Sequence, residues 1–311
     1  MINLNKKRIF FMFILIMLIL ISNNIVNDRI SNTINQSAVL ISKNIPLKNS
    51  NLSSIYSCIN ELEYNSNISI WTMLTDDDNY ALSAIKLLKS IKQNVDSIKF
   101  DSIILELKEK PLKENIKAML SKEGWSFCVI DRIKPRDEEN TLPRFRDQFS
   151  KLILWNMTEY KSLLYFDSDT FVIKNINNLL NSFQYLNDSL RIGCTRDIRS
   201  GKWQSTFNMG IFTIKPNKTE YERLIRLKDD QNLKFETKMS EQGFLNVVYQ
   251  NQWYDFGFIY NANLAVYSEL NNYWREYENN ISVIHYTIKK PWACSNKYKI
   301  VCDKWRLFKT N

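Results

Sequence analysis

The stretch Leu163-Leu164-Tyr165-Phe166-Asp167-Ser168-Asp169 is an apolar run that ends in two carboxylates. The apolar residues predict a buried strand over residues 162–166. In an extended chain, residues i and i+2 point to the same side, so Asp167 and Asp169 can converge on one ion. Carboxylate oxygens suit hard cations such as Mn²⁺ or Mg²⁺. Asp76-Asp77-Asp78 contains a second Asp-x-Asp, and only the position of Asp167 and Asp169 after a predicted strand favours them as metal ligands.

Strand-like and helix-like segments alternate on both sides of this stretch. The pattern predicts strands at 68–74, 102–107, 126–130, 191–195, 207–214 and 282–286, and helices at 79–93, 111–123 and 147–158. Such alternation predicts one α/β domain over residues 68–311, with a mostly parallel central sheet covered by helices. Ligands of such sheets bind beyond the carboxyl ends of the strands, which is where the two aspartates lie.

A phosphate-bearing ligand would not be held by a glycine-rich loop. The chain has only six glycines, and they form neither a G-x-G-x-x-G motif nor a P-loop. A diphosphate would therefore depend on a metal ion and basic side chains. The net charge of +9 favours an anionic ligand such as a nucleotide diphosphate. Basic and acidic residues are interspersed along the chain, which argues against a nucleic-acid partner.

His285 is the only histidine in the chain and lies in the strand-like run 283–286. A histidine in such a run is often a core residue. As a third ligand, its nitrogen beside two carboxylates fits Mn²⁺ better than Mg²⁺, which prefers oxygen alone and is the alternative cofactor. Metallohydrolases usually gather several histidines, so a single one argues against a metal-dependent phosphoesterase.

The N-terminal region has the pattern of a membrane anchor. Lys6, Lys7 and Arg8 precede an apolar run from Ile9 to Ile21, and no small-x-small cleavage site follows. The positive flank predicts a cytoplasmic tail, residues 1–8, and a signal-anchor transmembrane segment, residues 9–26. The Asn- and Ser-rich residues 27–67 are predicted to be a luminal stem. We therefore expect a single-pass type II protein of the Golgi or ER membrane. A cleaved signal peptide is the alternative, and it would also lead to the secretory pathway.

The cysteines agree with that compartment. Cys128 and Cys194 lie in strand-like runs and are predicted to be core thiols. Cys294 and Cys302 are close enough in sequence to close a small loop near the C-terminus.

Six short blocks between Ile70 and Trp292 occur in a characteristic order. They are Met73-Leu74-Thr75 with Tyr80, Phe149-Ser150-Lys151-Leu152, Tyr165-Phe166-Asp167-Ser168-Asp169-Thr170, Phe207-Asn208-Met209-Gly210-Ile211, Glu241-Gln242-Gly243-Phe244-Leu245-Asn246, and His285 with Lys290-Pro291-Trp292. In this order the chain resembles glycosyltransferase family 8, the glycogenin-like enzymes. Residues 151–155 and 241–246 also resemble the xylan glucuronosyltransferase branch of that family.

This resemblance implies a GT-A, Rossmann-like fold and retaining, Mn²⁺-dependent transfer of a hexosyl group from a UDP-sugar to a luminal glycan or glycoprotein. It implies that Asp167, Asp169 and His285 bind the metal, and that Glu241, Gln242 and Lys151 act in catalysis. The donor-binding residues that it implies are Leu74, Thr75, Tyr80, Lys151, Ser168, Asn208, Met209, Gln242 and Lys290.

The chain departs from the family pattern at three places. Glu241 stands where the family usually has an aspartate, which changes the reach of the carboxylate. Thr287-Ile288-Lys289 replace a glycine that often contacts phosphate. Asp76 and Asp77 stand where polar, often uncharged, residues meet the nucleotide.

Two other functions agree with parts of the sequence. One is a self-glucosylating, glycogenin-type primer with Tyr267 as acceptor, against which the predicted anchor argues. The other is a catalytically silent glycan-binding or scaffold protein, against which the intact metal ligands argue. A homodimer is compatible with the sequence, which names neither the sugar (glucosyl, glucuronosyl, galactosyl or N-acetylglucosaminyl) nor the acceptor.

Overall fold

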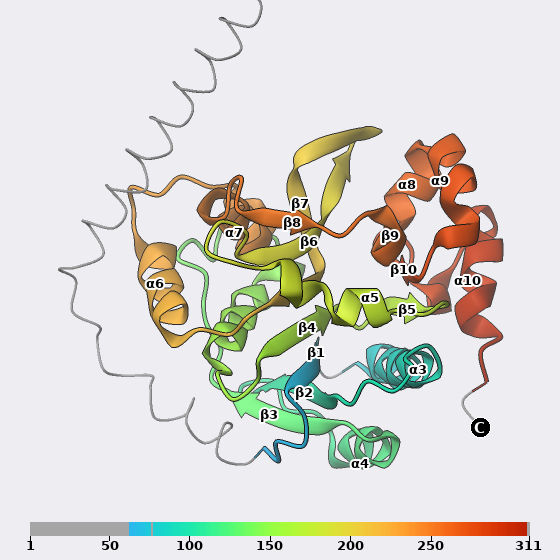
Figure 1. The fold of residues 1–311 in the computed structure, drawn as a ribbon, viewed down its shortest axis with the longest axis horizontal. Helices are drawn as coiled ribbons and strands as arrows, with labels where there is room; N and C mark the ends of the chain where they lie inside the picture. The colour runs from blue at the N-terminus through green and yellow to red at the C-terminus, as the bar shows by residue number, and fades with distance from the viewer. Residues whose placement is uncertain (1–61, 76, 310–311) are drawn as a thin grey trace, which may run out of the picture. The chain divides into compact units, whose positions relative to one another are not determined.

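The computed structural model describes residues 62–75 and 77–309 (Figure 1). Its contacts divide the chain into Met1–Lys48 and Asn49–Asn311, and the described residues all belong to the second unit. The predicted cytoplasmic tail, the anchor and the stem up to residue 61 lie outside them. These features and the secretory location stay predictions. Within the described part of the chain, no helix has the length and apolar character needed to cross a bilayer.

A seven-stranded sheet forms the centre of the domain (Figure 1). Four of its six strand pairings are parallel, which confirms the prediction of a mostly parallel sheet. In spatial order the strands are β3 (Ser126–Ile130), β2 (Asp101–Leu107), β1 (Ile68–Leu74), β4 (Ser162–Phe166), β7 (Lys202–Ile214), β6 (Ile192–Arg199) and β8 (Trp253–Asp255).

Strand β7 forms a hairpin with β6 and is therefore antiparallel to it. It is also antiparallel to its other neighbour, β4. The hairpin turns at Ser200 and Gly201, whose φ angles are 50° and 68°. Two successive positive φ angles are typical of the tight turns that match the twist of a β-hairpin. The long β7 strand thereby runs from this turn back beside β4, where Phe166 pairs with Ile211.

A small three-stranded sheet lies beyond β4. It consists of β5 (Thr170–Val172), β10 (Val283–His285) and β9 (Ala262–Asn263), with β10 in the middle. Strands β10 and β5 are antiparallel, and their register pairs His285 with Thr170. This register brings the only histidine next to the turn that carries Asp167 and Asp169.

Helices pack against both sheets. They are α3 (Asp78–Gln93), α4 (Glu114–Glu123), α5 (Asn177–Leu180), α6 (Lys218–Asp229), α7 (Ser240–Val248), α8 (Leu264–Glu269), α9 (Asn271–Tyr277) and α10 (Lys299–Arg306). The predicted helices near 79–93 and 111–123 are present, with starts at 78 and 114. The helix predicted at 147–158 is present at Gln148–Asn156, but it is a 3₁₀ helix, η2. Its residues Phe149–Asn156 are all buried, so no polar face favours a regular amphipathic helix, and packing sets its geometry.

The central strands are buried on both faces, as their continuous apolar runs predict. Trp71 and Tyr165 belong to a core cluster with η2 and α7. Ile70 and Leu164, their neighbours in sequence, belong to a different cluster with α3 and α5. Two packed faces hold β4 rigidly, and its carboxyl end leads into the predicted metal ligands Asp167 and Asp169.

The cysteine predictions are confirmed in part. Cys294 and Cys302 form a disulfide bond, and Cys194 is a buried free thiol. Cys128 is disulfide-bonded and not the core thiol that we expected. A strand-like run predicts burial, as found, but the pairing of a cysteine with a distant one depends on the tertiary structure.

Candidate metal and donor site

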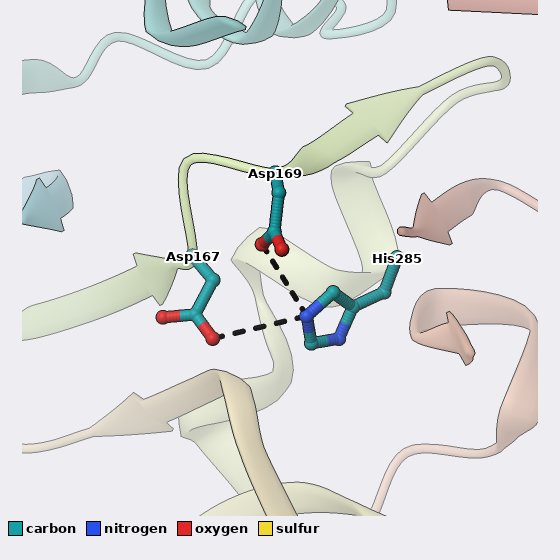
Figure 2. Close-up of side chains that lie close together, drawn as sticks. All are labelled: Asp167, Asp169 and His285. Atoms are coloured by element: carbon teal, nitrogen blue, oxygen red, sulfur yellow. Dashed lines mark ion pairs between the residues drawn. The ribbon is translucent and has the colours of Figure 1, made fainter. Parts of the chain in front are cut away.

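The structure brings the three predicted metal ligands together (Figure 2). One ligand atom from each of Asp167, Asp169 and His285 lies within 4.8 Å of the other two. His285 Nε2 is 3.4 Å from Asp169 Oδ1 and 3.8 Å from Asp167 Oδ2. Two carboxylates and an imidazole at these separations form a suitable partial coordination shell for a divalent cation.

The two aspartates converge for a different reason from the one that the sequence suggested. Asp167 follows the end of β4, and its backbone N–H donates to Gly210 O at 2.6 Å. The N–H and the hydroxyl of Thr170 both donate to Asp167 O, at 3.0 and 2.8 Å. The Asp-Ser-Asp motif is therefore a tight turn between β4 and β5 and not an extended segment, and the turn directs Asp169 toward His285.

His285 is oriented by a chain of amide side chains. Its Nδ1 lies 2.9 Å from Asn261 Oδ1; an amide oxygen only accepts, so Nδ1 donates, and this contact turns Nε2 toward the carboxylates. Asn261 Nδ2 in turn donates to Asn208 Oδ1 at 3.1 Å. Asn261 is buried and was missed by the sequence analysis, because no motif marks it.

Gly210 gives His285 the space that it occupies. A Cβ atom built at Gly210 would overlap His285 Cε1 and come within 2.7 Å of Nδ1. We therefore expect Gly210→Ala to displace the imidazole and weaken Mn²⁺ binding by roughly tenfold or more, measured by calorimetry. Gly193→Ala is the matched control, since its methyl would crowd Thr213 Cγ2 at 2.6 Å in the same sheet but away from His285. Equal losses of affinity in both variants would contradict the assignment.

Lys151 connects the metal site to Glu241. Its buried Nζ lies 3.0 Å from Asp167 Oδ1 and 3.2 Å from Glu241 Oε1, and 4.5 Å from the centroid of the Tyr165 ring. Burial opposes the charge of Lys151, but the carboxylates of Asp167 and Glu241 outweigh it and raise its pKa. Burial raises the pKa of Glu241 despite Lys151. The two carboxylates therefore favour the charged form of this lysine at the edge of the site.

Lys290 provides a second cation on the other side. Its Nζ forms an ion pair with Asp169 and donates to Tyr286 O at 3.0 Å. Burial opposes the charge of Asp169, but Lys290 and His285 lower its pKa well below the usual range. The two lysines therefore flank the aspartates, as a site for a diphosphate requires.

Gln242 and Asn208 share a carboxylate that the sequence analysis did not identify. Gln242 Nε2 donates to Asp197 Oδ2 at 3.0 Å, and Asn208 Nδ2 donates to Asp197 Oδ1 at 3.4 Å. Gln242 Oε1 accepts from Met209 N at 3.0 Å. Burial raises the pKa of Asp197 despite these hydrogen bonds. The only sign of this role in the sequence was an aspartate within the residues that form strand β6.

The helix start that carries Glu241 and Gln242 depends on a close backbone contact. A Cβ atom at Gly243 would overlap Glu236 O, which is backbone and cannot move aside easily. Ser240 precedes the pair with φ 53° and donates its hydroxyl to Phe145 O at 2.7 Å. The start of α7 is therefore held against Phe145, which precedes η2, and Glu241 lies beside Lys151.

The predicted nucleotide residues lie at the ends of β1 and β4, and their contacts with a donor stay predictions. Leu74 ends β1 and is buried, Thr75 follows it half-buried, and Ser168 is buried in the metal turn. The Tyr80 ring packs edge-on against Trp292, with centroids 4.9 Å apart. Burial raises the pKa of the Tyr80 hydroxyl, although Lys290 opposes the shift.

One of the departures from the family pattern has a structural explanation. Asp77 Oδ1 accepts hydrogen bonds from the backbone N–H groups of Asn79 at 2.8 Å and Tyr80 at 3.2 Å. It therefore caps α3, a common role for aspartate. Asp76 lies outside the described residues.

Comparison with known proteins agrees with this geometry. The sequence model described as "Glycosyl transferase family 8" matches residues 71–295. The chain is 28% identical to the uncharacterized protein R707 of Acanthamoeba polyphaga mimivirus, over 73% of this chain and 83% of that one. It is 27% identical to a putative UDP-glucuronate:xylan alpha-glucuronosyltransferase 4 of Arabidopsis thaliana, over 73% of this chain and 37% of that one. It is 24% identical to glycogenin-1 of Caenorhabditis elegans, over 71% of this chain and half of that one.

Two solved structures share the fold. The bifunctional glycosyltransferase WbbM matches 74% of this chain and 48% of its own, with a TM-score of 0.55 and 17% identity. The galactosyltransferase LgtC, solved with donor and acceptor sugar analogues, matches 77% of this chain and 94% of its own, with a TM-score of 0.53 and 15% identity. These likenesses confirm the predicted GT-A type fold.

Proposed function

Because the chain belongs to glycosyl transferase family 8, we propose that it is a retaining, Mn²⁺-dependent hexosyltransferase that uses a UDP-sugar donor. The observation that carries the proposal is the cluster of Asp167, Asp169 and His285 with a lysine on either side. The chain spans only 37% and 50% of the plant and nematode relatives, so the donor and acceptor are proposed from the site.

The residues of the cluster fit a resident divalent cation. The donor set is two carboxylates and one imidazole, and Asn261 holds the imidazole with Nε2 toward the carboxylates. This combination favours Mn²⁺ over Mg²⁺. When bound, the cation would neutralise charge that develops on the leaving UDP.

The protein's own side chains would do the remaining work. Lys151 and Lys290 are held as cations by carboxylates, so they are ready to stabilise a diphosphate without reorganising during the reaction. Gln242 and Asn208 are fixed by Asp197 and would orient the hydroxyl groups of the donor sugar. Glu241 lies 3.2 Å from Lys151, and this contact supports a role for its carboxylate beside the donor sugar. It would stabilise positive charge at the anomeric carbon.

A primer function with Tyr267 as acceptor is the second candidate. Tyr267 lies in α8, and its ring contacts Trp274 edge-on, with centroids 5.2 Å apart, and Tyr298 at 5.8 Å. An aromatic ring packed on two sides has less freedom to deliver its hydroxyl to a donor sugar. We therefore favour transfer to a separate glycan or glycoprotein.

Incubation of the full chain with UDP-glucose, UDP-glucuronate, UDP-galactose and UDP-N-acetylglucosamine tests the proposal. We expect release of UDP with one donor when Mn²⁺ is added and none with a chelator. Tyr267→Phe should leave this release unchanged, and mass spectrometry should find no hexose on the protein. Loss of release in Tyr267→Phe would favour the primer, whereas no release with any donor in Mn²⁺ or Mg²⁺ would favour a silent binding protein.

A further inference from the structure

The C-terminal segment carries most of the chain's net charge. Residues 287–309 contain six lysines and Arg306 but one acidic residue, Asp303, which gives +6 of the chain's +9. Lys299 pairs with Asp303. In the described part of the chain, no carboxylate forms an ion pair with Lys289, Lys304 or Lys309. Their charges are therefore free to attract an anionic partner.

The same segment exposes apolar side chains on one face of α10. Ile300 is 69% and Leu307 is 76% exposed, the highest values among the large apolar residues in the part of the chain that the structure describes. Positions 300, 304 and 307 follow helical spacing, so Lys304 lies between them on one face. We call Ile300, Lys304 and Leu307 the α10 face. The opposite side of the helix, with Val301 and Trp305, is buried.

The α10 face belongs to a helix that is tightly held. Lys86 Nζ donates to Trp305 O at 2.8 Å and to Phe308 O at 3.0 Å, and lies 4.2 Å from the centroid of the Trp305 ring. The disulfide between Cys294 and Cys302 ties the helix to the preceding loop. Ile300 and Leu307 are therefore presented to solvent by fixed structure and are not the loose end of a chain.

We propose that the α10 face binds the surface of a lipid bilayer that contains anionic lipids. Ile300 and Leu307 would insert among the lipid chains, while Lys304 and the nearby Lys309 would contact the phosphate groups. Exposed apolar side chains flanked by lysines suit contact with a membrane interface, because the lipid chains can bury the apolar groups and anionic headgroups attract the lysines. This small, strongly charged patch lacks the contiguous apolar area of a stable protein interface. The proposal does not depend on the donor or the acceptor of the transferase.

Along the sequence, the α10 face follows closely after a residue of the proposed donor site. Lys290, which pairs with Asp169, is followed by Pro291, whose carbonyl accepts from Arg306 Nε at 2.8 Å. Contact of α10 with a membrane would therefore bring the metal site near lipid-embedded molecules. The group that the lysines of the α10 face would recognise is the phosphate of a lipid headgroup.

A local reporter tests the proposal, because the predicted segment 9–26 would attach the full chain to vesicles by itself. Leu307→Cys would be labelled with an environment-sensitive fluorophore in the full chain. Met119→Cys is the matched control, since Met119 is a large apolar residue that is 48% exposed on α4, apart from α10 (Figure 1). Both proteins would be mixed with vesicles of phosphatidylcholine, with and without phosphatidylserine.

We expect a blue shift and a severalfold rise in emission at position 307 only when phosphatidylserine is present, and no change at position 119. Adding Ile300→Asp and Lys304→Glu should lower the partition of the 307 label by at least about tenfold. Inorganic phosphate should not reproduce the shift, since a free phosphate offers no apolar phase. No shift at position 307, or equal shifts at both positions, would overturn the proposal. A shift that rises with protein concentration without vesicles would assign the α10 face to a second copy of the chain instead.

Discussion

Replacing Asp169 with asparagine is expected to lower turnover of the UDP-sugar by at least about a hundredfold, a loss of about 2.7 kcal/mol in transition-state stabilisation. The substitution keeps the shape of the side chain but removes one of two anionic metal ligands. It also leaves Lys290 without the carboxylate that it contacts. Release of UDP at saturating Mn²⁺ measures the effect.

Asp78→Asn is the control for this variant. Asp78 belongs to the other Asp-x-Asp sequence, but its side chain is 74% exposed and it is not in the metal cluster. We expect the Asp78→Asn protein to release UDP as fast as the wild type does. An Asp169→Asn protein that keeps more than about a tenth of wild-type activity would refute the ligand assignment.

The same variant has a pH-dependent effect on stability. Despite burial, Lys290 and His285 lower the folded-state pKa of Asp169, so the ionised carboxylate stabilises the fold above the unfolded-state pKa of about 3.9. This contribution is lost as the pH falls through the folded-state pKa. Metal-free Asp169→Asn should therefore unfold at a lower temperature than the wild type at pH 7, and the difference should shrink in acid. Thermal unfolding with a chelator present measures it, and a constant difference from pH 7 down to acid would count against the ion pairs.

Replacing Glu241 with glutamine should lower kcat roughly a hundredfold and change the KM for the donor little. Loss of an interaction made mainly in the transition state lowers kcat, whereas loss of ground-state binding raises KM. Lys151 retains Asp167 as a partner in this variant, so the lysine stays charged and the fold is kept. Steady-state kinetics on the preferred UDP-sugar separate the two effects.

The pH profile of kcat gives a second readout for Glu241. Burial raises its pKa above the ordinary value, so the wild-type kcat should fall as the pH decreases through that raised pKa. Glu241→Gln should lack this acidic limb. Glu236→Gln is the control, since Glu236 lies shortly before α7 but pairs with Arg199 at the surface. Unchanged kcat in Glu241→Gln would reduce this residue to a carboxylate at a helix start.

Glu241→Asp restores the usual family residue and shortens the side chain by one methylene. The carboxylate would move away from Lys151, which now lies 3.2 Å from it. We expect activity to be kept but preference among UDP-sugars to shift, because the position of this carboxylate relative to the sugar changes. The four-donor panel measures the shift.

The sequence by itself determined the parts of the molecule that depend on short-range pattern. The bounds predicted for β1, β3 and β4 agree with the structure. For β1 and β4 the reason is that continuous apolar runs are buried on both faces of the sheet. The cluster of Asp167, Asp169 and His285 was predicted in the same way, from two aspartates after a strand and one histidine in another. The Cys294–Cys302 disulfide needed only proximity along the chain.

Only the tertiary structure decided the features that depend on contacts between distant segments. The pairing of β10 with β5 places His285 against the Asp167–Thr170 turn, and no local pattern specifies that register. Packing of η2 buries Lys151 between Asp167 and Glu241. The β6–β7 hairpin brings Asp197 to Asn208, and α7 adds Gln242. The partners Asn261 and Asp197 follow no motif. Buried polar groups are almost always hydrogen-bonded. Which partners they have depends on how the whole chain folds.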